Sequence, residues 1–333
     1  MTGSSGIKSG VSGDDGDTVD EDNQGDHILR AVWDGGAARV VATITTATVR
    51  EAVRRHGAGG HAALALARGT TAGLLLATLT KDDERVTLQV LGDGPLAGVT
   101  VDARSSGGVR AYVKNVVGGV LAVRSGERAS LAGALGSGGV VSVIRDLGLK
   151  ENVSGQTPLV AGELDTDVEH YLNTSEQIDS ALGCDALFVA SSPAIVVSGG
   201  LLVQALPGSA GSAFIERARA VLRDGALARA LAAQPEPSAE ALARAVLAEV
   251  EPGAAATRLQ VLEVRPVHFE CPCSRDRAAS SLALLGAAEL AAMIVEDGKA
   301  EVVCNFCRER YDFSEAELEL IRRETAPSGS LPS

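Results

Sequence analysis

Apolar and polar positions between residues 27 and 207 follow a pattern that predicts strands with a few helices. Residues 86–90 alternate with period two, which is typical of a half-buried strand, and residues 92–95 supply the Gly-Asp-Gly-Pro turn that leads to a partner strand at 99–101. Residues 61–79 form a long apolar helix pattern. Hairpins rather than regular βαβ units indicate an α+β fold for this N-terminal core domain.

The same reasoning places the other elements of the core domain. A helix pattern starts at Thr48 and ends at the glycine-rich break that begins at Gly57. Further strands are expected at residues 40–44, 109–113, 140–144, 187–189 and 201–206, and a further helix at 165–173.

Residues 208–264 are interpreted as a helical linker of two helices separated by Pro235 and Pro237, with Ser238 as the N-cap of the second. Each helix has one apolar face, made by Phe214, Ile215, Ala218, Val221 and Leu222, and by Leu242, Val246, Leu247 and Val250. Short alanine-rich helices are marginal in water, so we expect them to pack on the sheet of the first domain. The alternative is an ordinary interdomain helix pair without a switching role.

Four of the five cysteines form two close pairs, Cys271-Pro-Cys273 and Cys304-Asn-Phe-Cys307, with thirty residues between them. Four thiolates presented from two tight turns are a typical tetrahedral zinc site. The pattern therefore predicts Zn²⁺ bound by Cys271, Cys273, Cys304 and Cys307. Buried apolar cysteines and a permanent disulfide framework are the alternatives, and the second is disfavoured because no secretory signal is visible.

Close cysteines also allow redox chemistry, because neighbouring thiolates can form disulfides and would then no longer bind metal. Arg-acid-Arg tripeptides follow each pair, at residues 275–277 and 308–310, and either stabilise the thiolates or are solvated surface charge. The spacing alone does not distinguish a redox switch from a static zinc knuckle.

Residues 265–323 are expected to be a small zinc-binding domain with a terminal helix at 315–323. Between the cysteine pairs, a small apolar core is expected from Leu282, Leu285, Leu290, Met293 and Ile294. A segment of this size rarely folds on apolar burial alone, so the metal is expected to hold it together. Residues 324–333 are expected to be frayed.

Composition narrows the possible functions. The 333-residue chain is 45% hydrophobic but only 3% aromatic, and its net charge of −13 disfavours nucleic-acid binding. Residues 1–26 carry seven acids against Lys8 and are expected to be a disordered tail. No apolar run is long enough to span a membrane, so we expect a cytoplasmic protein.

The remaining histidine, cysteine and glycine candidates do not form a pattern typical of a catalytic site, so the chain is not expected to be an enzyme. Gly92-x-Gly94 precedes a strand rather than a helix, which excludes a dinucleotide loop. His61 and His170 are interpreted as surface or capping residues. Cys184 lies in an apolar segment and is predicted to be a buried, inert thiol.

The segment 267–277, VHFECPCSRDR, resembles the start of the zinc domain of the heat-shock protein 33 family of bacterial redox-regulated chaperones. Residues 296–298 with 304–307 and 311–313, and in the first domain residues 88–95, Tyr171 with 175–177, and 199–207, resemble the same family. The resemblance covers roughly residues 28–325. The acidic N-terminal tail and the alanine-rich linker depart from the family pattern. The resemblance implies a chaperone that is activated by oxidation, and the composition of the linker bears on how readily that activation occurs.

This resemblance implies an ATP-independent holdase that is inactive when reduced and zinc-bound. Oxidation, most simply to Cys271–Cys273 and Cys304–Cys307 disulfides, would release zinc, unfold the zinc domain and linker, and expose apolar surface to unfolding client proteins. It further implies a homodimer when oxidised and refolding by downstream ATP-dependent chaperones.

Two rival functions remain at this point. A static zinc-ribbon interaction module predicts metal binding that is insensitive to peroxide. A dithiol oxidoreductase predicts turnover of a disulfide substrate, but no thioredoxin-like βαβ pattern surrounds the CxxC pair.

Overall fold

The computed structural model describes residues 25–34, 37–81, 84–116, 121, 128–148, 152–189, 194–208, 212–234, 236–253 and 258–325. Nearly all of the acidic tail expected at 1–26, most of the frayed end expected at 324–333, and Pro235 lie outside these residues.

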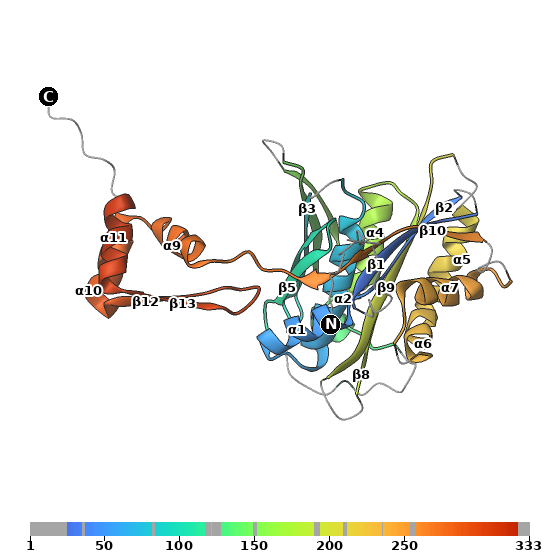
Figure 1. The fold of residues 1–333 in the computed structure, drawn as a ribbon, viewed down its shortest axis with the longest axis horizontal. Helices are drawn as coiled ribbons and strands as arrows, with labels where there is room; N and C mark the ends of the chain where they lie inside the picture. The colour runs from blue at the N-terminus through green and yellow to red at the C-terminus, as the bar shows by residue number, and fades with distance from the viewer. Residues whose placement is uncertain are drawn as a thin grey trace, which may run out of the picture.

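Two large sheets form the body of the molecule (Figure 1). The five-stranded sheet has the order β10 (Leu259–Pro266), β1 (His27–Trp33), β2 (Ala38–Ile44), β9 (Ile195–Ala205) and β8 (Ser180–Phe188). The six-stranded sheet has the order β11 (His268–Phe269), β5 (Gly108–Val113), β4 (Gly98–Arg104), β3 (Arg85–Gly92), β6 (Gly139–Asp146) and β7 (Val153–Pro158). All neighbours are antiparallel except β11 and β5.

The hairpin predicted from the alternating pattern is confirmed, because β3 pairs with β4 across the expected turn, with Leu88 opposite Val101. Helix α2 (Gly60–Ala77) contacts strands of both sheets, and all its residues but one are buried. Gly73 allows this close approach, since a Cβ there would lie 2.6 Å from Cγ1 of Val101. Helices α1 (Thr46–His56), α3 (Ala132–Leu135) and α4 (Leu164–Thr174) complete the core domain.

The linker helices α5 (Ser212–Arg223), α6 (Ala226–Ala232) and α7 (Ala239–Val250) pack on the face of the five-stranded sheet that is turned away from α2. Their apolar faces and the sheet share one buried cluster, in which the ring of Phe214 stacks on Trp33 at 5.1 Å. The expected packing on the first domain's sheet is therefore present. Ser238 accepts a hydrogen bond from the amide of Ala241, as predicted for an N-cap.

Two features of residues 208–264 differ from the sequence prediction. The segment holds three described helices rather than two, because Gly225 adopts a left-handed conformation and separates α5 from α6. Its end is not helical: β10 pairs with β1 at the edge of the five-stranded sheet. Hydropathy does not alternate along β10, since Leu262 and Val264 are exposed while Glu263 and Arg265 are half-buried, so the segment carries no clear local strand signal.

The C-terminal module comprises α9 (Arg275–Ala283), α10 (Ala287–Asp297), β12 (Lys299–Val303), β13 (Arg310–Ser314) and α11 (Glu315–Thr325) and lies to one side of the body (Figure 1). Its buried cluster consists of Ala278, Leu282, Leu290, Ala300, Phe313 and Leu318. Leu285 was a wrong core prediction, because it lies after the end of α9 and is 50% exposed.

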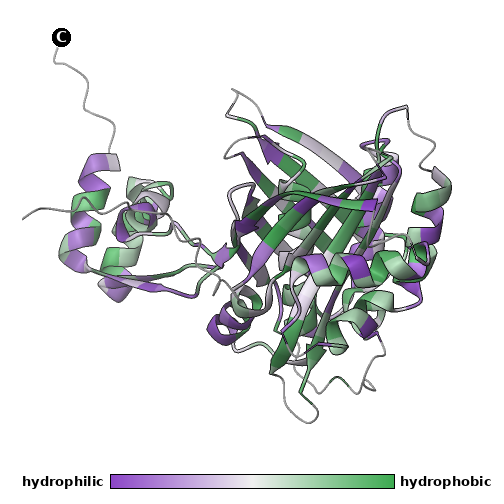
Figure 2. Ribbon diagram, turned by 45° about the vertical axis from the view of Figure 1, so that its right-hand side comes forward, coloured by the Kyte–Doolittle hydropathy of each residue, from purple (hydrophilic) through white to green (hydrophobic). Residues whose placement is uncertain are grey.

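In Figure 2, green and purple segments are mixed along the strands of the body, and β12, β13 and α11 of the C-terminal module also carry much purple. Among the described residues, no single helix is long and apolar enough to cross a membrane. Helices α9 and α10 meet that criterion only when combined, and they are bent by 108° relative to each other.

Candidate metal centre

The four paired cysteines converge at one point. Their Sγ atoms all lie within 4.8 Å of one another, although thirty residues separate the pairs. Two close approaches join the pairs: Cys271 Sγ lies 3.7 Å from Cys304 Sγ, and Cys273 Sγ lies 3.2 Å from Cys307 Sγ. Each pair therefore contributes one sulfur to each close contact.

This arrangement fits a tetrahedral metal ion. Sulfurs at about 2.3 Å from a central zinc ion stand roughly 3.8 Å from one another, which is close to the observed spacing. The cluster can therefore hold a metal ion with four sulfur ligands. Because all six sulfur pairs are short, the geometry does not select one disulfide pairing over another.

The thiols are electrostatically unequal. Burial opposes ionisation of Cys271, but hydrogen bonds from Arg110 and Cys273 outweigh it and bring the pKa of Cys271 below its ordinary value. Burial raises the pKa of Cys273 and of Cys307 above the ordinary value. A divalent cation held by these four sulfurs would supply the charge that stabilises them as thiolates.

The loop of the second pair is fixed by its own backbone. The amide of Cys304 donates to the carbonyl of Glu309, and the amide of Arg308 donates to the carbonyl of Cys304. Arg308 has φ of 63°, a left-handed conformation that turns the chain back into β13. The hydroxyl of Tyr311 donates to Cys273 Sγ at 3.2 Å, so the second half of the module also holds a sulfur of the first pair.

The second cysteine pair also rests on the core domain. The face that receives it consists of Arg55 and His56 of α1 and Arg110 and Tyr112 of β5. His56 Nε2 lies 2.9 Å from the carbonyl oxygen of Phe306, and Arg55 Nη1 donates to the carbonyl of Cys307 at 3.3 Å. The ring of Phe306 meets Tyr112 edge-on at 4.9 Å.

A continuous segment joins the linker side of the body to the cysteines. We call residues 259–269 the strap: β10 lines the edge of one sheet, and β11 lines the edge of the other beside β5. Gly107, with φ of 105°, lies beneath the strap, where a Cβ would overlap the carbonyl oxygen of Pro266. Cys271 follows two residues after β11, so the strap positions the first pair.

Two arginines of the Arg-acid-Arg tripeptides have partners other than the sulfurs. Arg275 pairs with Glu317 at 2.6 Å and lies over the ring of Phe313, and Arg310 pairs with Glu301 at 2.6 Å. The guanidinium group that does reach a sulfur is that of Arg110, from the core domain. Sequence reasoning missed it, because a pairing between positions 161 residues apart leaves no local signal.

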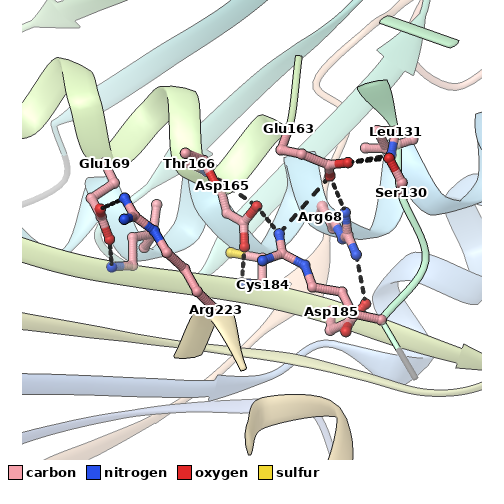
Figure 3. A network of polar contacts seen from close by, with 12 residues as sticks. Arg68, Ser130, Leu131, Glu163, Asp165, Thr166, Glu169, Cys184, Asp185 and Arg223 are labelled. Carbon is pink, nitrogen blue, oxygen red and sulfur yellow. Dashed lines mark hydrogen bonds and ion pairs between the residues drawn. The ribbon is translucent and has the colours of Figure 1, made fainter. Parts of the chain in front are cut away.

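A second polar cluster lies at the N-terminal end of α4 (Figure 3). Arg68 of α2 is fully buried and bonds Glu163 at 2.8 Å and Asp185 at 3.1 Å. Arg128 pairs with Asp165, and Asp165 also accepts a hydrogen bond from the amide of Cys184 at 3.1 Å. A single arginine within an apolar helix pattern was the signal for this cluster, and it was overlooked.

The cluster continues to the linker through Glu169 of α4. This carboxylate accepts from the amide of Leu182 at 2.9 Å and pairs with Arg219 at 3.0 Å and Arg223 at 3.1 Å, both from α5. Burial raises the pKa of Glu169, and the two arginines oppose that shift. The cluster therefore fastens α5 to the core domain.

The other residues singled out in the sequence are a cysteine, two histidines and a glycine-rich turn. Cys184 is buried, and burial raises the pKa of its thiol, as expected for an inert residue. His61 is part-exposed, and His170 Nδ1 lies 3.4 Å from the hydroxyl of Thr174. Strand β4 follows Gly92-x-Gly94, which agrees with the rejection of a dinucleotide loop.

Comparison with known proteins assigns the chain to a family. The family model described as "Hsp33 protein" matches residues 26–314. The chain belongs to the Hsp33 family. A family member from Listeria monocytogenes serotype 4a, named 33 kDa chaperonin, is 37% identical over 301 residues, which cover 90% of this chain and 99% of the relative. The 33 kDa chaperonin of Bacillus subtilis is 35% identical with the same coverage of both chains.

The fold is also that of the Hsp33 family. The crystal structure of the 33 kDa chaperonin, a heat shock protein 33 homolog, from Thermotoga maritima matches with a TM-score of 0.76 and 30% identity. The match covers 90% of this chain and 98% of the Thermotoga chain. The α+β architecture expected from the sequence is thus confirmed, and the chain is a member of a chaperone family.

Proposed function

We propose that this protein is a redox-regulated holdase, inactive while its four cysteines hold Zn²⁺ and active once they are oxidised. The observation that carries the proposal is the convergence of the four Sγ atoms within 4.8 Å at a site in contact with the core domain. When bound, zinc supplies a structural cross-link and no redox chemistry of its own. Cys271, Cys273, Cys304 and Cys307 are the proposed ligands.

Peroxide is the proposed oxidant. Formation of one disulfide takes one electron from each of two thiolate sulfurs, and with two protons these electrons reduce one peroxide to two water molecules. The proposed products are the Cys271–Cys273 and Cys304–Cys307 disulfides, so two peroxides are consumed per chain. Sulfurs in disulfides no longer bind the metal, and the small module loses the ligation that supports its fold.

The strap is the proposed path from the cysteines to the linker. β10 and β11 are edge strands, each held by one neighbouring strand, and they join the first cysteine pair to the segment after α7. Loss of the module frees the end of this strap. Detachment of β10 then removes a neighbour of the linker cluster, since Leu259 of β10 belongs to it.

Release of α5, α6 and α7 would uncover apolar side chains of β1, β2 and β9. Residues of this face include Leu29, Ala31, Val40, Leu201 and Val203. Such a surface binds the exposed apolar segments of unfolding proteins without requiring nucleotide. We further propose that the oxidised protein is a homodimer in the cytoplasm, and that ATP-dependent chaperones refold the clients it releases.

One oxidation experiment tests the proposal. Zinc release, helicity and suppression of client aggregation are followed together in reduced, zinc-loaded protein treated with peroxide at mild heat, without ATP. Metal release and loss of helicity should precede or accompany the gain of holdase activity, with about two disulfides formed per chain. Activity that stays unchanged while the metal is released would contradict the proposal.

The static zinc module is the alternative that the reduced geometry also accommodates. It predicts that peroxide neither releases the metal nor changes the linker. The same experiment distinguishes the two functions, because only the switch links sulfur oxidation to aggregation suppression.

A further inference from the structure

The contact between Arg110 and the cysteine cluster joins two parts of the chain that the sequence presents as separate domains. Arg110 lies on β5, and its side chain is only 15% exposed. Its Nη1 donates to Cys271 Sγ at 3.3 Å. The same guanidinium group lies 3.9 Å from the ring centre of Phe306, which stands between the cysteines of the second pair.

Asp102 of the neighbouring strand holds Arg110 in this position. Nε and Nη2 both donate to Oδ2 of Asp102 on β4, at 3.1 and 2.7 Å. The other oxygen of Asp102 accepts from the hydroxyl of Thr87 on β3 at 2.7 Å. Three adjacent strands thus supply a chain of hydrogen bonds that ends at a sulfur, and the arginine does not have to be ordered when the module docks.

We propose that Arg110 is an outer-sphere residue of the metal centre, supplied by the core domain, which raises metal affinity and couples metal binding to docking of the module. Four thiolates around a divalent cation carry a net charge of about −2. A guanidinium group donating to one of these sulfurs stabilises that charge where water is partly excluded. This inference rests on the proposed metal site.

The stacking of Phe306 makes the contact specific for the assembled cluster. Arg110 touches the first pair through Cys271 and the second pair through Phe306, so it meets both only when the two pairs are together. Metal that holds the pairs together therefore favours docking, and docking favours retention of the metal by the same factor. His56 and Arg55 add contacts to the second pair only.

The test compares Arg110→Met with Arg145→Met in the full-length, reduced protein. Arg145 is a matched control because it lies on β6 of the same sheet, is 16% exposed, and pairs with Glu176 at 2.6 Å. Affinity for Zn²⁺ is measured by competition with a chromophoric chelator, and Co²⁺ serves as a spectroscopic probe of the four-sulfur site. Loss of an outer-sphere partner typically lowers metal affinity by about 10- to 100-fold.

We expect Arg110→Met to weaken binding by a factor in that range and to accelerate amide exchange of β11. Arg145→Met should leave both unchanged. Equal metal affinity of Arg110→Met and wild type would overturn the proposal. If Arg110→Met does not fold, Arg110→Lys decides: a lysine cannot bond Asp102 and Cys271 while stacking on Phe306, so wild-type affinity in that variant also overturns it.

The outcome is separable from that of the proposed function. Wild-type protein that binds no metal at the four cysteines would refute the holdase mechanism itself. Wild-type protein that binds metal and releases it on oxidation, with Arg110→Met indistinguishable from it, would refute only the role of Arg110.

Discussion

The linker helices and the C-terminal module rest on the same core domain by different physical means. The linker shares an extensive apolar cluster with the five-stranded sheet, including Phe214, Leu231 and Leu247. The module has a buried cluster of six residues and docks mainly through polar groups around one aromatic ring. Apolar burial holds the first, and a few directed bonds, with the proposed sulfur ligation of a metal ion, hold the second.

In the proposed mechanism this difference separates sensing from response. A module whose fold depends on sulfur ligation would respond to a chemical change at the sulfurs, because six buried residues make a small core. The buried cluster that holds the linker contains no cysteine among the described residues, so we do not expect the linker to respond to oxidants directly. The strap is therefore the proposed path by which loss of the module reaches the linker.

The largest expected effect is on the module. Replacing Cys271, Cys273, Cys304 and Cys307 together by serine should abolish metal binding and remove folding free energy on the order of 10 kcal/mol. Hydrogen exchange should show α9, α10 and α11 unprotected while α2 stays protected. Cys184→Ser is the control, because it removes a thiol outside the cluster. A quadruple variant whose module remains protected would abolish the contrast between the two regions.

The linker should respond to loss of apolar volume instead. Leu247 lies on α7 and is fully buried, so Leu247→Ala should weaken the packing of the linker on the sheet by about 2–5 kcal/mol. Reduced, metal-loaded Leu247→Ala should then bind an apolar dye and suppress aggregation without oxidant. Leu262→Ala is the control, since Leu262 on β10 is 60% exposed. Unchanged dye binding in Leu247→Ala would show that apolar burial does not hold the linker.

The polar contacts of the linker should contribute less to the free energy of unfolding than its apolar burial does. Glu169→Gln leaves Arg219 and Arg223 without their shared carboxylate, and we expect a cost of about 1–3 kcal/mol in unfolding free energy. Glu216→Gln removes the exposed partner of the same Arg219 and should cost roughly 0–1 kcal/mol. Denaturant melts of the two variants give the comparison, and equal midpoints would argue against the role of Glu169.

The smallest effect concerns the start of α7. Ser238→Ala removes the hydroxyl that accepts from the amide of Ala241 and should destabilise the helix by about 1 kcal/mol. Ser280→Ala on exposed α9 removes a bond from a serine to the carbonyl of Asp276 and should be nearly neutral. A thermal melt that ranks the two variants in the opposite order would count against this capping role.

Local patterns predicted what is locally determined. The alternation that ends in a Gly-Asp-Gly-Pro turn specified the β3–β4 hairpin, and the apolar faces of α5 and α7 specified their burial. The spacing of the cysteines specified that they would meet, because two short turns present two sulfurs each. These predictions needed only the periodicity of a single segment.

Features that depend on distant pairing were missed. β10 pairs with β1 across more than two hundred residues, and Arg110 reaches Cys271 across 161. In each case the partner is chosen by tertiary packing, which a single sequence does not display. Arg68 is different, because a lone arginine in an apolar helix pattern was a local signal; what the sequence did not display is that Glu163 and Asp185, from separate elements, offset the cost of burying it.

Gly107 has a consequence for how the molecule returns to its resting state. The strap packs against it so closely that a Cβ there would overlap the carbonyl oxygen of Pro266, and the amide of His268 bonds to its carbonyl at 3.1 Å. A strap that has left this contact must return to it in register. In the proposed mechanism, docking after reduction should therefore be slower than release on oxidation, so that holdase activity outlasts a brief exposure to oxidant.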